Sequence, residues 1–100
     1  MTIQGRLEDQ VAIVTGGSRG IGFAVACAFA REGARLALAA VRDQDALEKA
    51  KAEIAAPGRD VIAMLADVRR RGDAERLVQA AIAKWGRIDI LVNNAGILRL

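Results

Sequence analysis

The chain alternates short apolar runs with longer segments in which apolar and polar residues mix. The apolar runs lie at residues 11–14, 36–41, 61–66 and 88–92. Short runs of this kind, bounded by glycine or polar residues, are typical of strands buried on both faces. The alanines of the second run would also suit a helix, and only Gly33 and the polar residues after Val41 favour a strand there. The pattern therefore predicts four strands.

The first mixed segment has the spacing of an amphipathic helix. Its apolar residues recur at i, i+4, i+7 and i+8, and they are Ile21, Val25, Ala28 and Phe29. This spacing places one apolar stripe on a helix that ends near Gly33. We expect that stripe to face the strands.

Two more helices are predicted between the later runs. Asp45, with Glu48 three residues on, resembles a capping box that opens a helix, and Pro57 and Gly58 would end it. Asp73 can cap a third helix that runs to Gly86. The apolar positions of this third helix are Ala74, Leu77, Val78, Ala81, Ile82 and Trp85.

The order β-α-β-α-β-α-β predicts an α/β fold with a doubly wound parallel sheet in three layers. Short connections favour right-handed crossovers and the strand order 3-2-1-4. The fourth strand, 88–92, would then be an uncovered edge, so the sheet is expected to be incomplete on that side. We therefore expect residues 1–100 to be the N-terminal part of a single domain of a longer protein.

Composition excludes several classes of function. The chain has 53% apolar residues, which excludes disorder, and its net charge is only +3. With 3% aromatic residues and one short basic run, 69–71, nucleic-acid binding is not expected. Cys27 is the only cysteine and there is no His, so neither a disulfide nor a zinc or other metal site is expected. Without an export segment or a membrane-spanning run, the expected location is cytoplasmic.

The connection after the first strand is rich in glycine, and it reads Thr15-Gly16-Gly17-Ser18-Arg19-Gly20-Ile21-Gly22. In a dinucleotide-binding turn, Gly16 would allow the exit from the strand, Gly20 the approach of a pyrophosphate and Gly22 the contact between helix and strand. The first N–H groups of the helix would face the phosphates. An ordinary glycine turn is the alternative, but the buried strand before it and the amphipathic helix after it favour nucleotide binding.

The residues after the second strand bear on the choice of cofactor. NAD needs an acidic residue about 20 positions past the glycines, whereas NADP needs positive charge for its 2′-phosphate. Counting from Gly22 reaches no carboxylate but reaches Arg42, and Arg19 could reach the same oxygens. The pattern therefore favours NADP over NAD. Asp43 keeps NAD open, because a longer second strand could aim its carboxylate at the ribose.

Three motifs in order resemble the short-chain dehydrogenase/reductase family. The glycine turn has that family's spacing, Asp67-Val68 ends the third strand, and Asn93-Asn94-Ala95-Gly96 follows the fourth. The chain is most similar to the branch of bacterial 3-oxoacyl-[acyl-carrier-protein] reductases. The resemblance implies a Rossmann domain and an enzyme, commonly a homo-oligomer, that passes hydride between the nicotinamide and a small carbonyl or alcohol substrate.

The resemblance also implies roles for single residues. The glycine turn would hold the phosphates and the adenosine end, Asp67 would accept a hydrogen bond from the adenine amino group, and residues 94–96 would line the ribose. From turn chemistry alone, Asp67 could simply end a strand and the two asparagines could simply make a turn. The expected cofactor-binding residues are Gly16, Ser18, Arg19, Gly20, Ile21, Gly22, Arg42, Asp67, Val68, Asn94, Ala95 and Gly96.

The family's proton-transfer residues have no counterpart in the chain. They are a Tyr, a Lys four residues later and a Ser, all beyond the second signature, whereas this sequence has no Tyr and its only Ser is Ser18. We therefore expect no catalytic residue here and no activity from residues 1–100 alone. Two alternatives to the cofactor-binding part of a reductase are a non-catalytic nucleotide-binding or interaction module of the same fold and a half-domain that binds nothing.

Overall fold

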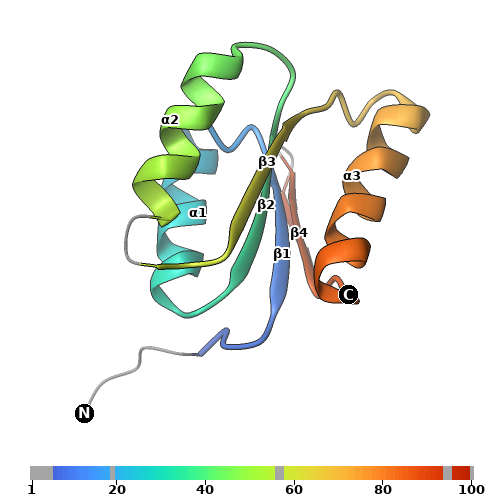
Figure 1. Cartoon of the computed structure of the whole chain (residues 1–100). Helices are drawn as coiled ribbons and strands as arrows, with labels where there is room; N and C mark the ends of the chain where they lie inside the picture. Colours follow the sequence, from blue (N-terminus) through green and yellow to red (C-terminus); the bar gives the residue numbers. More distant parts are fainter. Residues whose placement is uncertain (1–5, 19, 56–57, 94–95, 100) are drawn as a thin grey trace.

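The computed structural model describes residues 6–18, 20–55, 58–93 and 96–99 of the 100-residue chain. A central sheet separates two helices on one face from one helix on the other (Figure 1). The strands are β1 (Val11–Thr15), β2 (Arg35–Ala40), β3 (Val61–Leu65), β4 (Ile90–Asn93) and β5 (Gly96–Arg99). The helices are α1 (Gly20–Arg31), α2 (Gln44–Ala55) and α3 (Arg71–Trp85).

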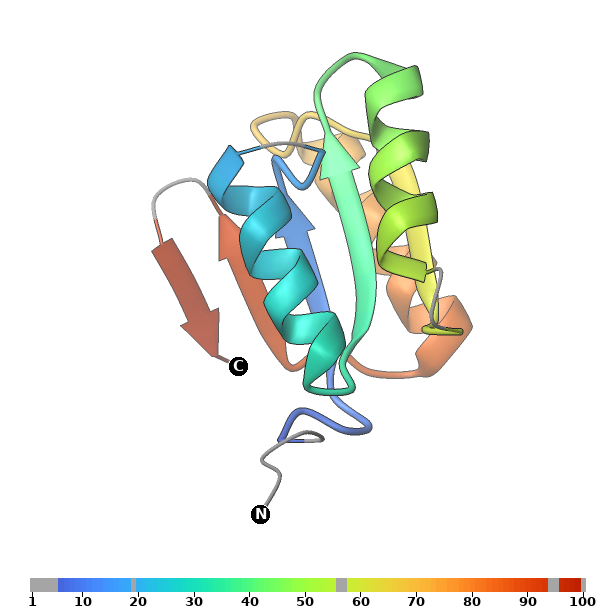
Figure 2. The same ribbon diagram turned by 90° about the vertical axis from the view of Figure 1, so that its left-hand side faces the viewer.

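The sheet has the order β3-β2-β1-β4-β5, and its first four strands are parallel. The predicted order 3-2-1-4 and the three layers are therefore confirmed. The register pairs Val14 with Leu38 on one side and with Val92 on the other. The carboxyl ends of β1, β2 and β4 consequently meet at one edge of the sheet, which Figure 2 shows at the tips of the strand arrows.

The prediction that the fourth strand is an uncovered edge is wrong. β5 pairs antiparallel with β4, with Gly96 opposite Asn93 (Figure 2). An edge strand presents unpaired N–H and C=O groups, and residues 96–99 supply partners for them. Gly96, which we expected in a polar turn lining a ribose, is therefore a strand residue.

The apolar stripe predicted for α1 is only partly correct. The residues of α1 that are fully buried are Ala26 and Ala30, while Val25 and Phe29 are partly buried against the core and Ile21 is 84% exposed. The reason is close packing, because small residues let a helix approach a sheet more closely than large ones.

The two predicted helix caps are also wrong. Asp43, not Asp45, caps α2, because its Oδ1 accepts a hydrogen bond from the Ala46 N–H at 3.1 Å. Asp43 has φ 70°, a left-handed conformation that aspartate tolerates better than most residues. Asp73 lies inside the first turn of α3, and the N-cap residue, Arg70, makes no side-chain capping bond.

The core lies on both faces of the sheet. On the side of α1 and α2, the large buried side chains include Val14, Leu36, Leu38 and Leu47. On the side of α3, the buried cluster includes Val11, Ile13, Leu77 and Ala81, while Val78 and Ile82 are each 41% exposed. Among the described residues no helix has the length and apolar character needed to cross a membrane.

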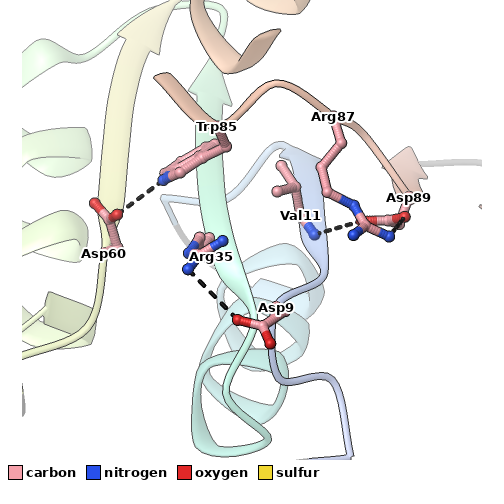
Figure 3. A network of polar contacts seen from close by, with 7 residues as sticks. All are labelled: Asp9, Val11, Arg35, Asp60, Trp85, Arg87 and Asp89. Carbon is pink, nitrogen blue, oxygen red and sulfur yellow. Dashed lines mark hydrogen bonds and ion pairs between the residues drawn. The ribbon is translucent and has the colours of Figure 1, made fainter. Parts of the chain in front are cut away.

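The edge where the strands begin is held by polar contacts (Figure 3). Asp89 Oδ2 accepts hydrogen bonds from the backbone N–H of Val11 and from Arg87 Nε, each at 2.9 Å. Trp85 Nε1 donates to Asp60 Oδ2 at 2.8 Å, and Lys84 Nζ lies 3.6 Å from Asp60 Oδ1. These contacts join the end of α3 and the residues before β3 and β4 to the rest of the sheet.

Candidate functional site

A cavity of about 620 Å³ lies at the carboxyl edge of the parallel strands. Its walls come from the loops after β1, β2 and β3 and from the end of β4. It is lined by Thr15, Gly16, Ser18, Ala40, Val41, Arg42, Ala66, Asp67, Val68, Arg69 and Asn93. Ligands of doubly wound folds bind outside the carboxyl ends of the strands, where the strand order reverses, and β1 and β4 form that point here.

The glycine turn after β1 is built on close backbone contacts. Gly16 has φ 69°, and its N–H donates to Ala39 O at 2.8 Å, which ties the turn to the end of β2. A Cβ on Gly22 would lie 2.1 Å from the carbonyl oxygen of Gly16, a distance that no side chain can accept. A side chain at position 22 would therefore displace the turn, the left-handed φ of Gly16 favours glycine there, and the start of α1 rests directly on the turn.

The first two residues of α1, Gly20 and Ile21, are exposed. α1 begins at Gly20, which has φ 61°, and it carries no acidic residue in its first turn. The first N–H groups of a helix have no partner within the helix, and they carry its positive dipole end. The turn therefore offers an anion several backbone donors next to the cavity that Gly16 and Ser18 line.

Arg42 and Asp43 follow β2 but differ in what they do. β2 ends at Ala40, and Arg42 is exposed and lines the cavity. The Asp43 carboxylate accepts the Ala46 N–H, so it belongs to the start of α2 and is not among the cavity's lining residues. The longer second strand that would have aimed Asp43 at a ligand is not formed.

Asp67 is held in a defined orientation after β3. Arg69 donates to both of its oxygens, from Nε to Oδ1 at 2.9 Å and from Nη2 to Oδ2 at 2.8 Å. These bonds, together with the backbone N–H of Arg69, lower the pKa of Asp67 to about 2. The Asp67 N–H donates to Asp73 Oδ2 at 2.9 Å, and this bond is the main reason that the pKa of Asp73 is also lowered.

Thr15 and Asn93 connect the ends of β1 and β4. The Thr15 hydroxyl lies 3.0 Å from Asn93 Oδ1 and 3.3 Å from the carbonyl oxygen of Val92, so it can donate to either acceptor. Sequence reasoning did not select Thr15, Asn93 or Arg69 as site residues, although all three line the cavity. For Thr15 the missed signal was its place at the last position of a parallel strand, directly before Gly16.

The structure brings most of the predicted residues to one edge. Gly16, Ser18, Arg42, Asp67 and Val68 line the cavity, and 20–22 form the adjoining start of α1. Arg19, Asn94 and Ala95 lie outside the described residues.

Proton-transfer chemistry is not supported by these residues. Lys84 contacts Asp60 at the opposite edge of the sheet, and Lys49 and Lys51 lie on α2. Within the described ranges there is no cluster of three or more residues that could hold a metal ion. The arrangement can bind and orient a ligand. Its class is that of a dinucleotide-binding doubly wound domain, with a glycine turn before a helix N-terminus and an acidic residue after the third strand.

Comparison with known proteins agrees with this class. The family model for short chain dehydrogenase matches residues 10–100. The chain belongs to the short-chain dehydrogenase/reductase family, and binding of NAD or NADP fits this family.

Individual relatives show how much of such a protein the chain represents. It is 42% identical over 94 residues to the short chain dehydrogenase/reductase nsrJ of Aspergillus novofumigatus, covering 94% of this chain and 36% of nsrJ. It is 43% identical over 93 residues to the 3-oxoacyl-[acyl-carrier-protein] reductase of Synechocystis sp., covering 93% of this chain and 38% of that protein. The chain thus spans little more than a third of the length of these relatives.

Solved structures match the fold as well. A short chain dehydrogenase/reductase from Burkholderia phymatum, solved in complex with NAD, has a TM-score of 0.81 and 32% sequence identity. The match covers 91% of this chain and 31% of that chain.

Proposed function

We propose that the chain is the NADP(H)-binding part of a short-chain reductase. The complete protein passes hydride between the nicotinamide and a small carbonyl or alcohol substrate. The choice of NADP rests on the different contacts of the two charged residues after β2. Arg42 lines the cavity, whereas Asp43 is occupied in capping α2. A guanidinium binds a phosphate with charge-assisted hydrogen bonds, and a ribose 2′-hydroxyl would need a carboxylate at this place.

The residues present fit such a cofactor. A Cβ on Gly22 would collide with the Gly16 carbonyl, so the start of α1 lies directly against the glycine turn, and Gly20 carries no side chain between the helix start and a pyrophosphate. The start of α1 supplies N–H donors for the phosphates, Arg42 would meet the 2′-phosphate, and Asp67 would accept from adenine. When bound, the nicotinamide ring supplies the hydride. In this proposal these residues hold and orient the cofactor.

Binding measurements test the choice of cofactor. NADPH and NADH are titrated separately into the protein, and we expect the tighter dissociation constant for NADPH. Arg42→Ala should weaken NADPH binding about tenfold, the value of one charge-assisted hydrogen bond, and leave NADH nearly unchanged. Arg71→Ala is the matched control, because Arg71 is exposed and pairs with Glu75 on α3 instead of lining the cavity. Tighter binding of NADH, or an equal loss for both dinucleotides in Arg42→Ala, would contradict the proposal.

A second candidate is a non-catalytic nucleotide-binding module. It keeps the nucleotide cavity without a proton-transfer group, because the one carboxylate among the described lining residues, Asp67, is ion-paired with Arg69. Such a group cannot shuttle protons near neutral pH. The two candidates differ in turnover by the full-length protein. Oxidation of NADPH in the presence of small carbonyl compounds supports the reductase, and tight binding without turnover supports the module.

A further inference from the structure

Arg69 makes a bidentate ion pair with the carboxylate of Asp67. Its Nε and Nη2 donate to different oxygens of Asp67, at 2.9 and 2.8 Å, and its own N–H donates to Oδ1 at 3.1 Å. The Arg69 side chain is 81% exposed and the Asp67 side chain 16% exposed. Because two guanidinium nitrogens bind different oxygens, this bidentate pair defines the orientation of the carboxylate.

The bidentate pair occupies some, but not all, of the hydrogen-bond acceptor positions of the Asp67 carboxylate. A carboxylate offers about four acceptor positions, two on each oxygen. Oδ1 of Asp67 accepts from the Arg69 N–H and from Arg69 Nε, and Oδ2 accepts from Arg69 Nη2. Among the contacts of the described residues, one position on Oδ2 is left. The carboxylate can therefore take one further donor, from a fixed direction.

The backbone that carries this carboxylate is also fixed. The Asp67 N–H donates to Asp73 Oδ2, and Arg76 Nη2 donates to Asp73 Oδ1 at 3.2 Å and to the carbonyl oxygen of Leu65 at 3.3 Å. The Arg70 N–H closes the turn by donating to Asp67 O at 2.8 Å. With the backbone anchored by α3, Arg69 is the group that sets how the carboxylate is rotated.

We infer that Arg69 is a positioning residue for adenine: it holds Asp67 so that Oδ2 offers a single acceptor position to the adenine amino group. This inference rests on the proposed function, because it names how that site selects the base. Arg69 does not need to touch the base. It favours an N–H donor at that place and disfavours a carbonyl oxygen, because a carbonyl would face a carboxylate held ionised and fixed.

The test compares two dinucleotides in the full-length protein. NADP carries the amino group on adenine, and its hypoxanthine analogue carries a carbonyl oxygen at the same position. The measured quantity is the ratio of the two dissociation constants at neutral pH. Non-specific changes in charge weaken both ligands equally and cancel in the ratio. The variants are Arg69→Gln, Arg69→Lys and, as the matched control, Arg71→Gln, which removes an exposed charge outside the cavity.

We expect the unchanged protein to prefer NADP about tenfold, the effect of one hydrogen bond to a charged group. In Arg69→Gln the ratio should fall at least about threefold. In Arg69→Lys it should also fall, because an ammonium group cannot hold both oxygens. Arg71→Gln should keep the ratio.

Other results distinguish a failure of the positioning role of Arg69 from a failure of the proposed function. An unchanged ratio in Arg69→Gln, or a full ratio in Arg69→Lys, overturns the positioning role. Tighter binding of both ligands by Arg69→Gln also overturns it, because Arg69 would then cover the site. If the unchanged protein binds both ligands equally, the adenine contact is wrong while the proposed function stands. If it binds neither, the proposed function itself fails.

Discussion

The two edges of the sheet differ in where their polar groups find partners. At the edge where strands begin, the carboxylates of Asp89 and Asp60 accept hydrogen bonds from backbone and side-chain donors of neighbouring segments. At the edge where strands end, Gly16 and Arg42 face a cavity of about 620 Å³. The first edge uses its polar groups to hold strands and helix ends together. The second places the guanidinium of Arg42 and the exposed start of α1 around a space of ligand size.

The largest expected effect is at the carboxyl edge, in Gly22→Ala. The added Cβ would lie 2.1 Å from the Gly16 carbonyl oxygen, so the turn or α1 must move. We expect a loss of about 3 kcal/mol or more in the free energy of unfolding, together with loss of NADPH binding. Denaturant unfolding and ligand titration measure the two quantities. Gly72→Ala is the control, since nothing lies within 4 Å of its Cβ position. Equal stability of the two variants would show that the turn is not tightly packed.

At the amino edge, Asp89→Ala should reduce stability without changing the binding edge. It leaves the N–H of the buried Val11 without the acceptor that Asp89 Oδ2 provides at 2.9 Å. Loss of such a partner costs about 1–3 kcal/mol. Urea unfolding measures the loss, and NADPH affinity should stay the same. Asp9→Asn, which removes the charge from an exposed pair with Arg35 and keeps a residue that tolerates the left-handed φ of 66°, should change stability by less than about 0.5 kcal/mol. A large fall in NADPH affinity in Asp89→Ala would mean that the edges are coupled.

A smaller loss is expected for Trp85→Phe, also at the amino edge. The substitution keeps most of the ring but removes the Nε1–H donor to Asp60. We expect a loss of about 1 kcal/mol in the free energy of unfolding. Lys84→Gln should cost less, because Lys84 Nζ is 3.6 Å from Asp60 in a largely exposed pair. The opposite ranking would show that charge, and not the indole hydrogen bond, holds the end of α3.

The smallest effect is a pH dependence at the carboxyl edge. The pKa of Asp67 is about 2 in the folded chain, below its ordinary value of 3.8. A lowered pKa adds stability above the unfolded value, and this contribution is lost as the pH falls from about 4 toward 2. The melting-temperature advantage of the unchanged protein over Asp67→Asn should therefore shrink over that range. An advantage that stays constant down to pH 2 would show that Asp67 is not held by Arg69.

The sequence predicted the order of strands because each apolar run was short and bounded. It could not predict β5, because residues 96–99 pair with β4 through backbone groups that carry no side-chain pattern. The stripe on α1 was misplaced for a related reason. The spacing of large apolar residues predicted that Ile21 would face the sheet. In the structure the small residues Ala26 and Ala30 are the buried ones, because they allow the helix to pack closely.

At the site, the sequence predicted the residues that lie in motifs of known spacing. It did not predict the residues whose role depends on hydrogen bonds formed only in the folded chain. Arg42 and Asp67 follow strand ends, so their arrival at the cavity could be predicted from the parallel sheet. The roles of Asp43 and Arg69 depend on local hydrogen bonds, to the Ala46 N–H and to the Asp67 carboxylate. Such bonds are decided by backbone angles, including the left-handed conformation of Asp43, which spacing does not reveal.

The hydrogen bond between Thr15 and Asn93 joins residues 78 positions apart. During synthesis the N-terminal turn leaves the ribosome long before its partner at the end of β4. The last wall of the cavity can form only when β4 is in place. Under the proposed function, a dinucleotide bound at this wall would stabilise chains in which β4 has already paired with β1.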